Sequence, residues 1–340
     1  MILKPFAFLY WMVVAIRNKG YDIGVFKAHS LPKPVLSVGN ITVGGTGKTP
    51  VVRMLCEKLL ERGLKPAILS RGYMRKGTED VIFKSPPPES TTADTIGDEP
   101  YMLSRQLNGV IFGISANRRR VGMKILESHN PDIFVLDDGF QHRQLRRDVD
   151  FVVLDSDNPF GGNANLPRGM LREHPSSLAR ADIILIRNSH QESSDDNLSS
   201  KVRSYAPDAH IFDVFLRPEK IISLAGTESE RPEFLKHRPV FAFCGIANPE
   251  GFKKTLESLQ TKIMDFVGFR DHHRYSSADV ERLNRKFMSS DAEFGITTMK
   301  DGAKLSNHRL NFPLYTLDVI YVLKPRSEEI LLPMILNKLN

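Results

Sequence analysis

Apolar residues along the chain fall into short runs that alternate with stretches of helical spacing. Six runs read as buried strands, at residues 35–38, 66–69, 110–114, 133–136, 151–154 and 183–186. After the first run, Val51, Leu55 and Leu59 recur at the spacing of one helix face. Strands that alternate with helices predict an α/β fold with a doubly wound, mostly parallel sheet.

The same pattern predicts a second, smaller α/β domain. After a Leu-Arg-Pro segment at residues 216–218, the strand pattern restarts at residues 240–245, which run into a glycine turn. We therefore expect three parts: an N-terminal helix at residues 1–20, the larger domain at 21–216 and the smaller domain at 217–340.

The N-terminus begins with an unbroken apolar and aromatic run, FAFLYWMVVAI, at residues 6–16. A membrane-spanning helix needs roughly 20 apolar residues, so this run is too short to span. Arg17 and Lys19 follow where a signal peptide has a small-residue cleavage site. The pattern favours an interfacial helix on an anionic membrane surface, with a helix docked on the protein's own core as the alternative.

Charge and cysteine content narrow the classes of protein further. The net charge is +7, and residues 1–75 alone hold 12 Lys and Arg against 3 Asp and Glu. This basic excess lies beside the aromatic run rather than along a base-stacking groove, so we expect no nucleic-acid partner. The chain has 2 cysteines, neither in a CxxC pair, which excludes a disulfide framework and a zinc ribbon.

A phosphate-binding loop follows the first predicted strand. Residues 39–50 read GNITVGGTGKTP and are followed by the helical stretch, which is the context that a P-loop requires. Lys48 is placed to reach the β- and γ-phosphates, and the Thr49 hydroxyl to bind Mg²⁺. Thr42 stands where the P-loop pattern has its first glycine. The predicted nucleotide-binding residues are Thr42, Val43, Gly44, Gly45, Thr46, Gly47, Lys48 and Thr49.

The strand at residues 133–136 leads into two acidic residues, Asp137 and Asp138. An apolar strand that ends in aspartate is the Walker B form, and Asp137 is the better candidate for the metal. Neither of the sequence tests for a GTPase is met, because the DxxG and [NT]KxD patterns are absent at the expected places.

Two further clusters could act on an acceptor group. Asp98 and Glu99 precede Pro100 at a predicted helix start, where they could share base and metal roles or serve only as a helix cap. The Asp-His-His run at residues 271–273 could orient and charge an imidazole, or be an ordinary surface loop.

Together these motifs resemble the tetraacyldisaccharide 4'-kinase family, the lipid A 4'-kinases. The resemblance covers most of the chain in order. It runs through VGNITVGGTGKTP at 38–50, SRGY at 70–73, GDEP at 97–100, DDGFQH at 137–142, LRE at 171–173, DHH at 271–273 and KDGAKL at 300–305. One departure is Met299, where the family commonly has glutamate.

The resemblance implies a kinase that uses ATP and Mg²⁺ and transfers the γ-phosphoryl group to the 4'-hydroxyl of tetraacyldisaccharide 1-phosphate, giving lipid IVA. It implies two α/β/α lobes and a monotopic protein on the cytoplasmic face of a Gram-negative inner membrane, without an obligate protein partner. The catalytic residues that it implies are Asp98 and His272, with Lys48 on the phosphates. It places Glu99 and Asp137 with Thr49 on the metal side, and Arg71, Arg118 and Arg172 against phosphate or sugar groups.

A second class of function remains open on the sequence alone. A membrane-associated P-loop ATPase that acts as a switch or motor would share the loop and the acidic strand end. Such a protein would hydrolyse ATP without a lipid acceptor and would not need Asp98.

Overall fold

The computed structural model describes residues 3–188, 196–225, 229–305 and 308–339. The chain forms two compact units, Met1–Leu216 together with Tyr321–Asn340, and Arg217–Ile320. Residues 321–340, which the sequence pattern groups with the C-terminal domain, therefore belong to the first unit. The physical reason is that Leu331 and Ile335 of the last helix are buried in the core of that unit.

The first unit is built on a mostly parallel sheet with β1 (Val35–Gly39) near its middle. The strand order is β8-β7-β6-β1-β5-β2-β4-β3, and only β3 runs antiparallel to its neighbour among these described strands. The remaining bounds are β2 (Pro66–Ser70), β3 (Val81–Lys84), β4 (Ile111–Ile114), β5 (Ile133–Asp137), β6 (Val149–Asp155), β7 (Ile183–Asn188) and β8 (His210–Ser223). The six predicted strands are all present, and the predicted doubly wound α/β fold is confirmed.

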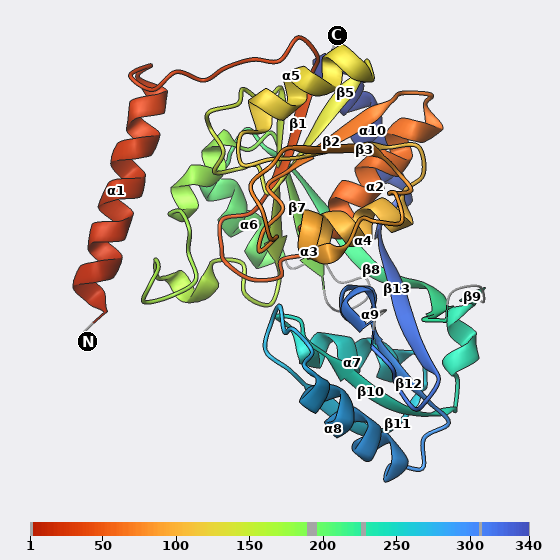
Figure 1. Ribbon diagram of the computed structural model, residues 1–340. Helices are drawn as coiled ribbons and strands as arrows, with labels where there is room; N and C mark the ends of the chain where they lie inside the picture. Colours follow the sequence, from red (N-terminus) through yellow and green to blue (C-terminus); the bar gives the residue numbers. More distant parts are fainter. Residues whose placement is uncertain (1–2, 189–195, 226–228, 306–307, 340) are drawn as a thin grey trace. The chain divides into compact units, whose positions relative to one another are not determined.

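Helices cover both faces of this sheet, as Figure 1 shows. Alternate strand residues, such as Leu36 and Val38 of β1, pack with α2 (Lys48–Glu61), α4 (Asp98–Gln106) and α10 (Pro325–Leu339). The opposite face packs against α5 (Arg118–Ser128) and α6 (Asp196–Tyr205). Because both faces are covered, the strands carry apolar residues on both sides, which explains their uninterrupted apolar runs.

Shorter elements complete the first unit. The helix α3 (Ala93–Ile96) precedes α4, and two 3₁₀ helices, η1 (Gly161–Asn163) and η2 (Pro175–Arg180), lie between β6 and β7 in the sequence. The N-terminal helix α1 (Lys4–Asp22) contains the apolar run, with Pro5 in its first turn. Within the described residues, no helix combines the length and the apolar character needed to cross a bilayer.

The strands of the second unit run parallel to one another in the order β11-β10-β12-β13. Its strands are β10 (Pro239–Cys244), β11 (Lys262–Gly268), β12 (Phe294–Thr298) and β13 (Leu314–Leu323), and the short β9 (Ser229–Glu230) pairs with the end of β8. The helices are α7 (Pro249–Ser258), α8 (Ser277–Met288), α9 (Met299–Leu305) and the 3₁₀ helix η3 (Pro232–Leu235). The chain enters this unit along β8 and leaves it along β13.

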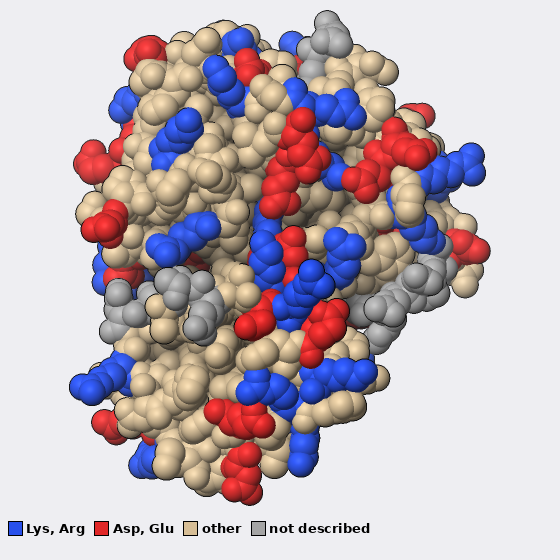
Figure 2. All heavy atoms as spheres, turned by 90° about the vertical axis from the view of Figure 1, so that its right-hand side faces the viewer, with Lys and Arg blue, Asp and Glu red and all other residues tan. Residues whose placement is uncertain are grey.

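Charged side chains of both signs are intermingled on the face drawn in Figure 2. Charged side chains of the first unit also form ion pairs with one another; Asp80, for example, pairs with Arg120 and Lys124 at 2.7 and 2.8 Å. Among the residues drawn on that face, acidic groups interrupt the basic ones, so they form no broad surface of a single sign.

Candidate active site

The glycine-rich loop between β1 and α2 has the geometry of a phosphate cradle. Gly47 is the N-cap of α2 with φ +89°, and a Cβ placed there would lie 1.9 Å from the Tyr321 hydroxyl oxygen. Gly39 is equally constrained, because its Cβ would lie 2.5 Å from the Cβ of Phe140. The turn before α2 is therefore tightly packed, and it leads into a helix N-terminus, whose backbone N–H groups suit phosphate oxygens.

The structure explains why Thr42 replaces a glycine. Thr42 forms an isolated antiparallel bridge with Leu171, and the neighbouring Val43 N–H donates to the Met170 carbonyl at 2.8 Å. A residue in such a bridge has extended backbone, which threonine adopts readily. The positive φ values of the loop fall instead on Gly44, at +108°, and Gly47, at +89°.

Asp138 contacts two cationic side chains of the site, those of Arg172 and Lys48. Arg172 donates to both of its carboxylate oxygens, at 2.7 and 3.0 Å, and the Lys48 ammonium lies 3.5 Å from Oδ1. Burial raises the pKa of Asp138, but Lys48 and Arg172 outweigh it and hold that pKa well below its usual range. Asp138 is therefore a permanent anion that positions Lys48 and Arg172.

Asp137 lies in the opposite electrostatic surroundings. It is 2% exposed, and its Oδ2 accepts a hydrogen bond from Ser70 Oγ at 3.1 Å. Its buried Oδ1 has no hydrogen-bond partner among the described residues. Burial raises the pKa of Asp137, and the nearby charges of Glu99 and Asp138 raise it further. A buried carboxylate oxygen left without a partner, next to further carboxylates, fits a divalent cation.

Two of the three predicted arginines, Arg118 and Arg172, contact this pair of aspartates, and the charge of Arg71 acts on Arg118. Arg118 is buried, and its Nη2 lies 3.4 Å from the Asp137 carbonyl oxygen. Burial lowers the pKa of Arg118, while the charges of Asp137 and Asp138 raise it and those of Arg71 and Arg172 lower it. The structure thus brings Arg71, Arg118 and Arg172 within electrostatic reach of one another and of the nucleotide loop.

Asp98 and Glu99 form the first turn of α4. The N-cap is Gly97, with φ +97°, so Asp98 and Glu99 occupy the first helical positions rather than the N-cap itself. Gly97 packs against Gly72, because a Cβ placed on Gly97 would lie 3.0 Å from the Gly72 backbone. Both carboxylates lie at the positive end of the α4 dipole, and the charge of Glu99 acts on Asp137.

His272 belongs to the second unit. Its φ is +55°, and its Nε2 lies 3.1 Å from the Lys300 ammonium, which also contacts Asp271 at 3.3 Å. His273 instead stacks on Phe269 and lies 3.1 Å from Asp279. The two histidines therefore have different surroundings, and only His272 belongs to the Lys300 cluster.

The KDGAKL segment forms α9 behind this histidine loop. Asp301 is fully buried and accepts hydrogen bonds from the Gly245 N–H and the Thr298 hydroxyl, at 2.9 and 2.7 Å. Met299, the departure from the family pattern, lies beside Thr316, whose hydroxyl is 3.1 Å from its sulfur.

Several residues of the site were missed by the sequence analysis. Asn40 donates to Thr46 Oγ1 at 2.8 Å and accepts from Arg172, and Ser70 holds Asp137. Asn40 follows β1 and Ser70 ends β2. Ligands of open α/β sheets bind at such strand ends, so this position is the signal that could have identified both residues. Tyr321 beside Gly47 had no local signal, because it arrives from the far end of the chain.

A buried strand, a glycine loop with lysine at the start of the next helix, and an acidic strand end beside that lysine define a P-loop nucleotide-binding protein. The model of the family described as tetraacyldisaccharide-1-P 4'-kinase matches residues 1–336. The chain belongs to this kinase family, as its motifs predict.

Relatives and a solved structure agree with this placement. The chain is 38% identical to the tetraacyldisaccharide 4'-kinase of Syntrophus aciditrophicus over 337 residues, which cover 96% of this chain and 90% of that protein. It is also 38% identical to that of Desulfotalea psychrophila, over 92% of this chain and 90% of the relative. The crystal structure of LpxK from Aquifex aeolicus in complex with ATP superposes with a TM-score of 0.78 and 31% identity, covering 99% of this chain and 98% of that one.

Proposed function

We propose that the protein transfers the γ-phosphoryl group of ATP to the 4'-hydroxyl of a tetraacyldisaccharide 1-phosphate, giving lipid IVA. The observation that carries the proposal is the nucleotide loop in contact with the Asp137–Asp138 strand end, in a chain whose family is named for this reaction. The relative solved with ATP supports the choice of nucleotide.

We assign the ATP side of the reaction to the first unit. Lys48 binds the transferred phosphate, and Asp138 positions the Lys48 side chain. Arg71, Arg118 and Arg172 supply positive charge to phosphate or sugar groups. The bound Mg²⁺ would neutralise charge on the β- and γ-phosphates. Thr49, Glu99 and Asp137 are its candidate protein ligands, and the partnerless Oδ1 of Asp137 supports that choice.

Few protein ligands are enough for this ion. Among the residues that the structure describes, no group of three or more His, Cys, Asp or Glu could hold a metal by itself. Mg²⁺ commonly uses one or two carboxylates and completes its shell with phosphate oxygens and water. The donor set therefore fits an ion that arrives with the nucleotide.

We assign Asp98 and His272 to the acceptor hydroxyl. One of the two residues accepts the proton of that hydroxyl as the phosphoryl group is transferred. Asp98 is in the first turn of α4, and Lys300 lies next to His272. Because the two residues belong to different units, kinetics of the double variant test their pairing.

We also propose that α1 lies in the interface of the cytoplasmic leaflet of an inner membrane, where the lipid A precursor resides. Phe6, Phe8, Val13 and Ile16 of this helix are all more than half exposed, which is costly in water and favourable at a bilayer. The basic N-terminal segment suits both anionic lipid and a phosphorylated sugar.

The direct test is transfer of label from γ-labelled ATP to purified disaccharide 1-phosphate in detergent, with product identified by mass. Phosphate on the 4'-position in the native chain, and none in Lys48→Ala, is the expected result. ATP hydrolysis that needs no lipid would favour the switch or motor instead.

A further inference from the structure

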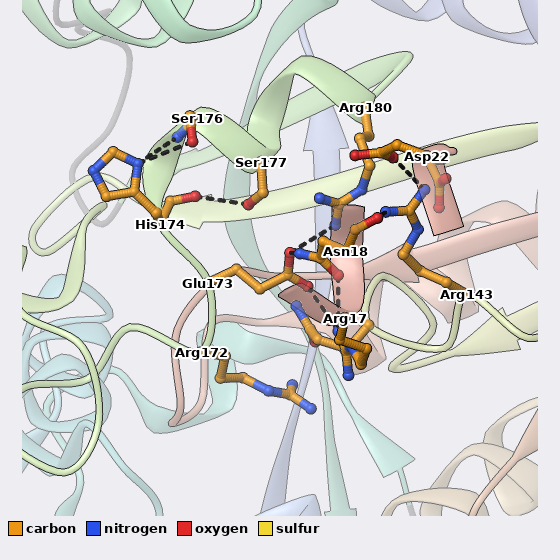
Figure 3. A network of polar contacts seen from close by, with 12 residues as sticks. Arg17, Asn18, Asp22, Arg143, Arg172, Glu173, His174, Ser176, Ser177 and Arg180 are labelled. Atoms are coloured by element: carbon orange, nitrogen blue, oxygen red, sulfur yellow. Dashed lines mark hydrogen bonds and ion pairs between the residues drawn. The ribbon is translucent and has the colours of Figure 1, made fainter. Parts of the chain in front are cut away.

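The buried carboxylate of Glu173 holds the N-terminal helix. It is 1% exposed, and its Oε2 accepts hydrogen bonds from Asn18 Nδ2 at 2.6 Å and from Arg180 Nη2 at 2.9 Å. Arg17 of α1 lies 3.7 Å from Oε1. Figure 3 shows these side chains converging on Glu173 from α1 and from η2. Hydrogen bonds to a buried charge are among the stronger contacts in a protein, so this is a firm attachment point for α1.

Residues 170–173, which end at Glu173, form a segment that we call the strap. The strap lies along the nucleotide loop. Its backbone pairs with the first half of that loop: the Arg172 N–H donates to the Ile41 carbonyl at 2.8 Å, and Leu171 bridges to Thr42. The Arg172 side chain then reaches Asp138 and Asn40. Any shift of the strap must therefore move the loop and its cations.

The N-terminal helix contacts this strap directly. Tyr10 donates its hydroxyl proton to the Arg172 carbonyl at 3.1 Å, one residue before the Glu173 attachment. Only Ala7 and Gly20 of α1 are buried, so few apolar contacts fix this helix to the rest of the unit. Polar contacts to the strap and to Arg143 hold it, while its apolar side chains stay exposed.

We propose that Glu173 is a positioning residue through which α1, when bound to an anionic membrane surface, orders the strap and the nucleotide loop, so that ATP binds more tightly at the membrane. The proposal rests on the interfacial location of α1 argued above. A bilayer that immobilises α1 makes the Asn18 and Tyr10 contacts persistent, and thereby stabilises the loop geometry that ATP needs. By linkage, bound ATP strengthens membrane binding by the same factor.

The test measures the dissociation constant of a non-hydrolysable ATP analogue with Mg²⁺, using the full chain. It is measured without lipid, with phosphatidylethanolamine vesicles containing phosphatidylglycerol, and with neutral phosphatidylcholine vesicles. For the native chain we expect anionic vesicles to tighten nucleotide binding by about five- to 150-fold, the range of typical coupling between two sites. Asn18→Ala and Glu173→Gln should lose this response, whereas Glu127→Gln, an exposed glutamate of α5, should keep it.

Two results would overturn the proposal: nucleotide binding by the native chain that ignores vesicles, or an Asn18→Ala chain that responds as strongly as the native one. Asn18→Ala is the decisive variant, because it keeps the Arg180–Glu173 pair and so the local fold, whereas Glu173→Gln removes a buried charge. A merely structural role would weaken binding equally with and without vesicles. Failure of the kinase proposal is separate, since it would appear as absent phosphate transfer whatever the vesicle response.

Discussion

Two adjacent aspartates at the end of β5 have opposite electrostatic surroundings. Asp138 faces Lys48 and Arg172, which keep it ionised, whereas burial and the charge of Glu99 raise the pKa of Asp137. Paired acids whose pKa values are pushed apart commonly divide their roles. We therefore propose that Asp138 positions Lys48 and Arg172, and that Asp137 binds the metal ion.

His142, on the loop that follows these aspartates, should make stability depend on pH. Burial lowers its pKa from 6.5 to about 4, helped by the charges of Arg118, Arg147 and Arg71. The unfolded chain binds a proton at His142 near pH 6.5, whereas the folded chain binds it only near pH 4. The stability that neutral His142 gives the folded state is therefore fully present above pH 6.5, and the unfolding free energy falls as the pH falls from 6.5 toward 4. Between pH 7 and pH 5 the native chain should lose about 1–2 kcal/mol more unfolding free energy than His142→Gln. Urea unfolding at several pH values measures this, and parallel curves for the two chains would contradict it.

The proposed Asp98–His272 pair predicts non-additive kinetics. A general base contributes about 10²–10⁴-fold, so each alanine variant should lower kcat by that order while ATP affinity changes only a few fold. The double variant should cost far less than the product of the single effects, because residues that act as a unit are not additive. Multiplicative losses would show independent roles, and lost ATP binding in Asp98→Ala would move that residue to the metal side.

At the scale of elements, the loop between β1 and α2 depends on a strand from the far end of the chain. Tyr321 of β13 is 4% exposed, its pKa is raised to about 12 by burial, and its hydroxyl lies against Gly47. Arg187 hydrogen-bonds to this hydroxyl and pairs with Asp155, so three strands of the sheet fix the N-cap of α2.

Gly47→Ala should therefore damage the nucleotide site. The new Cβ would meet the Tyr321 hydroxyl at 1.9 Å on a backbone with φ +89°, and such strain costs about 1–3 kcal/mol. We expect at least tenfold weaker ATP binding with little change in overall secondary structure. Gly63→Ala is the matched control, because Gly63 also has a positive φ but nothing within 4 Å. Equal ATP affinity in the two variants would contradict the role given to this contact.

Removing residues 1–18 should leave a folded protein that binds membranes less well. Of the described residues 3–18, the apolar side chains are mostly exposed and only Ala7 is buried, so the core loses little. Vesicle flotation of the truncated and full chains measures the effect, with circular dichroism as the check on folding. An unchanged membrane-bound fraction would show that α1 is not the interfacial element.

The sequence pattern predicted the main strands and part of the candidate site. The buried strand at 35–38, the glycine loop and the acid at the end of β5 are local signals, since strand ends, phosphate loops and helix starts each need particular neighbouring residues. The long-range contacts were not accessible: Arg172 meets Asp138 across 34 positions and Asn18 meets Glu173 across 155. Packing of whole elements decides such contacts, and no local pattern encodes it.

At the scale of the whole molecule, each of the two units carries part of the proposed chemistry. The first holds the nucleotide loop, Asp98 and the arginines, and the second holds His272 with Lys300. The proposed interfacial location of α1, which rests on its exposed apolar side chains, would set where such an enzyme can meet a lipid substrate.

The most direct test of the central claim is the coupling between ATP consumption and lipid phosphorylation. Labelled phosphate on the disaccharide and ADP released are counted in the same detergent reaction, with and without acceptor. A kinase should form one phosphorylated lipid for each ADP, should release almost no ADP without acceptor, and should lose both activities in Lys48→Ala. Rapid ADP release that ignores the lipid, or that survives Lys48→Ala, would contradict the account.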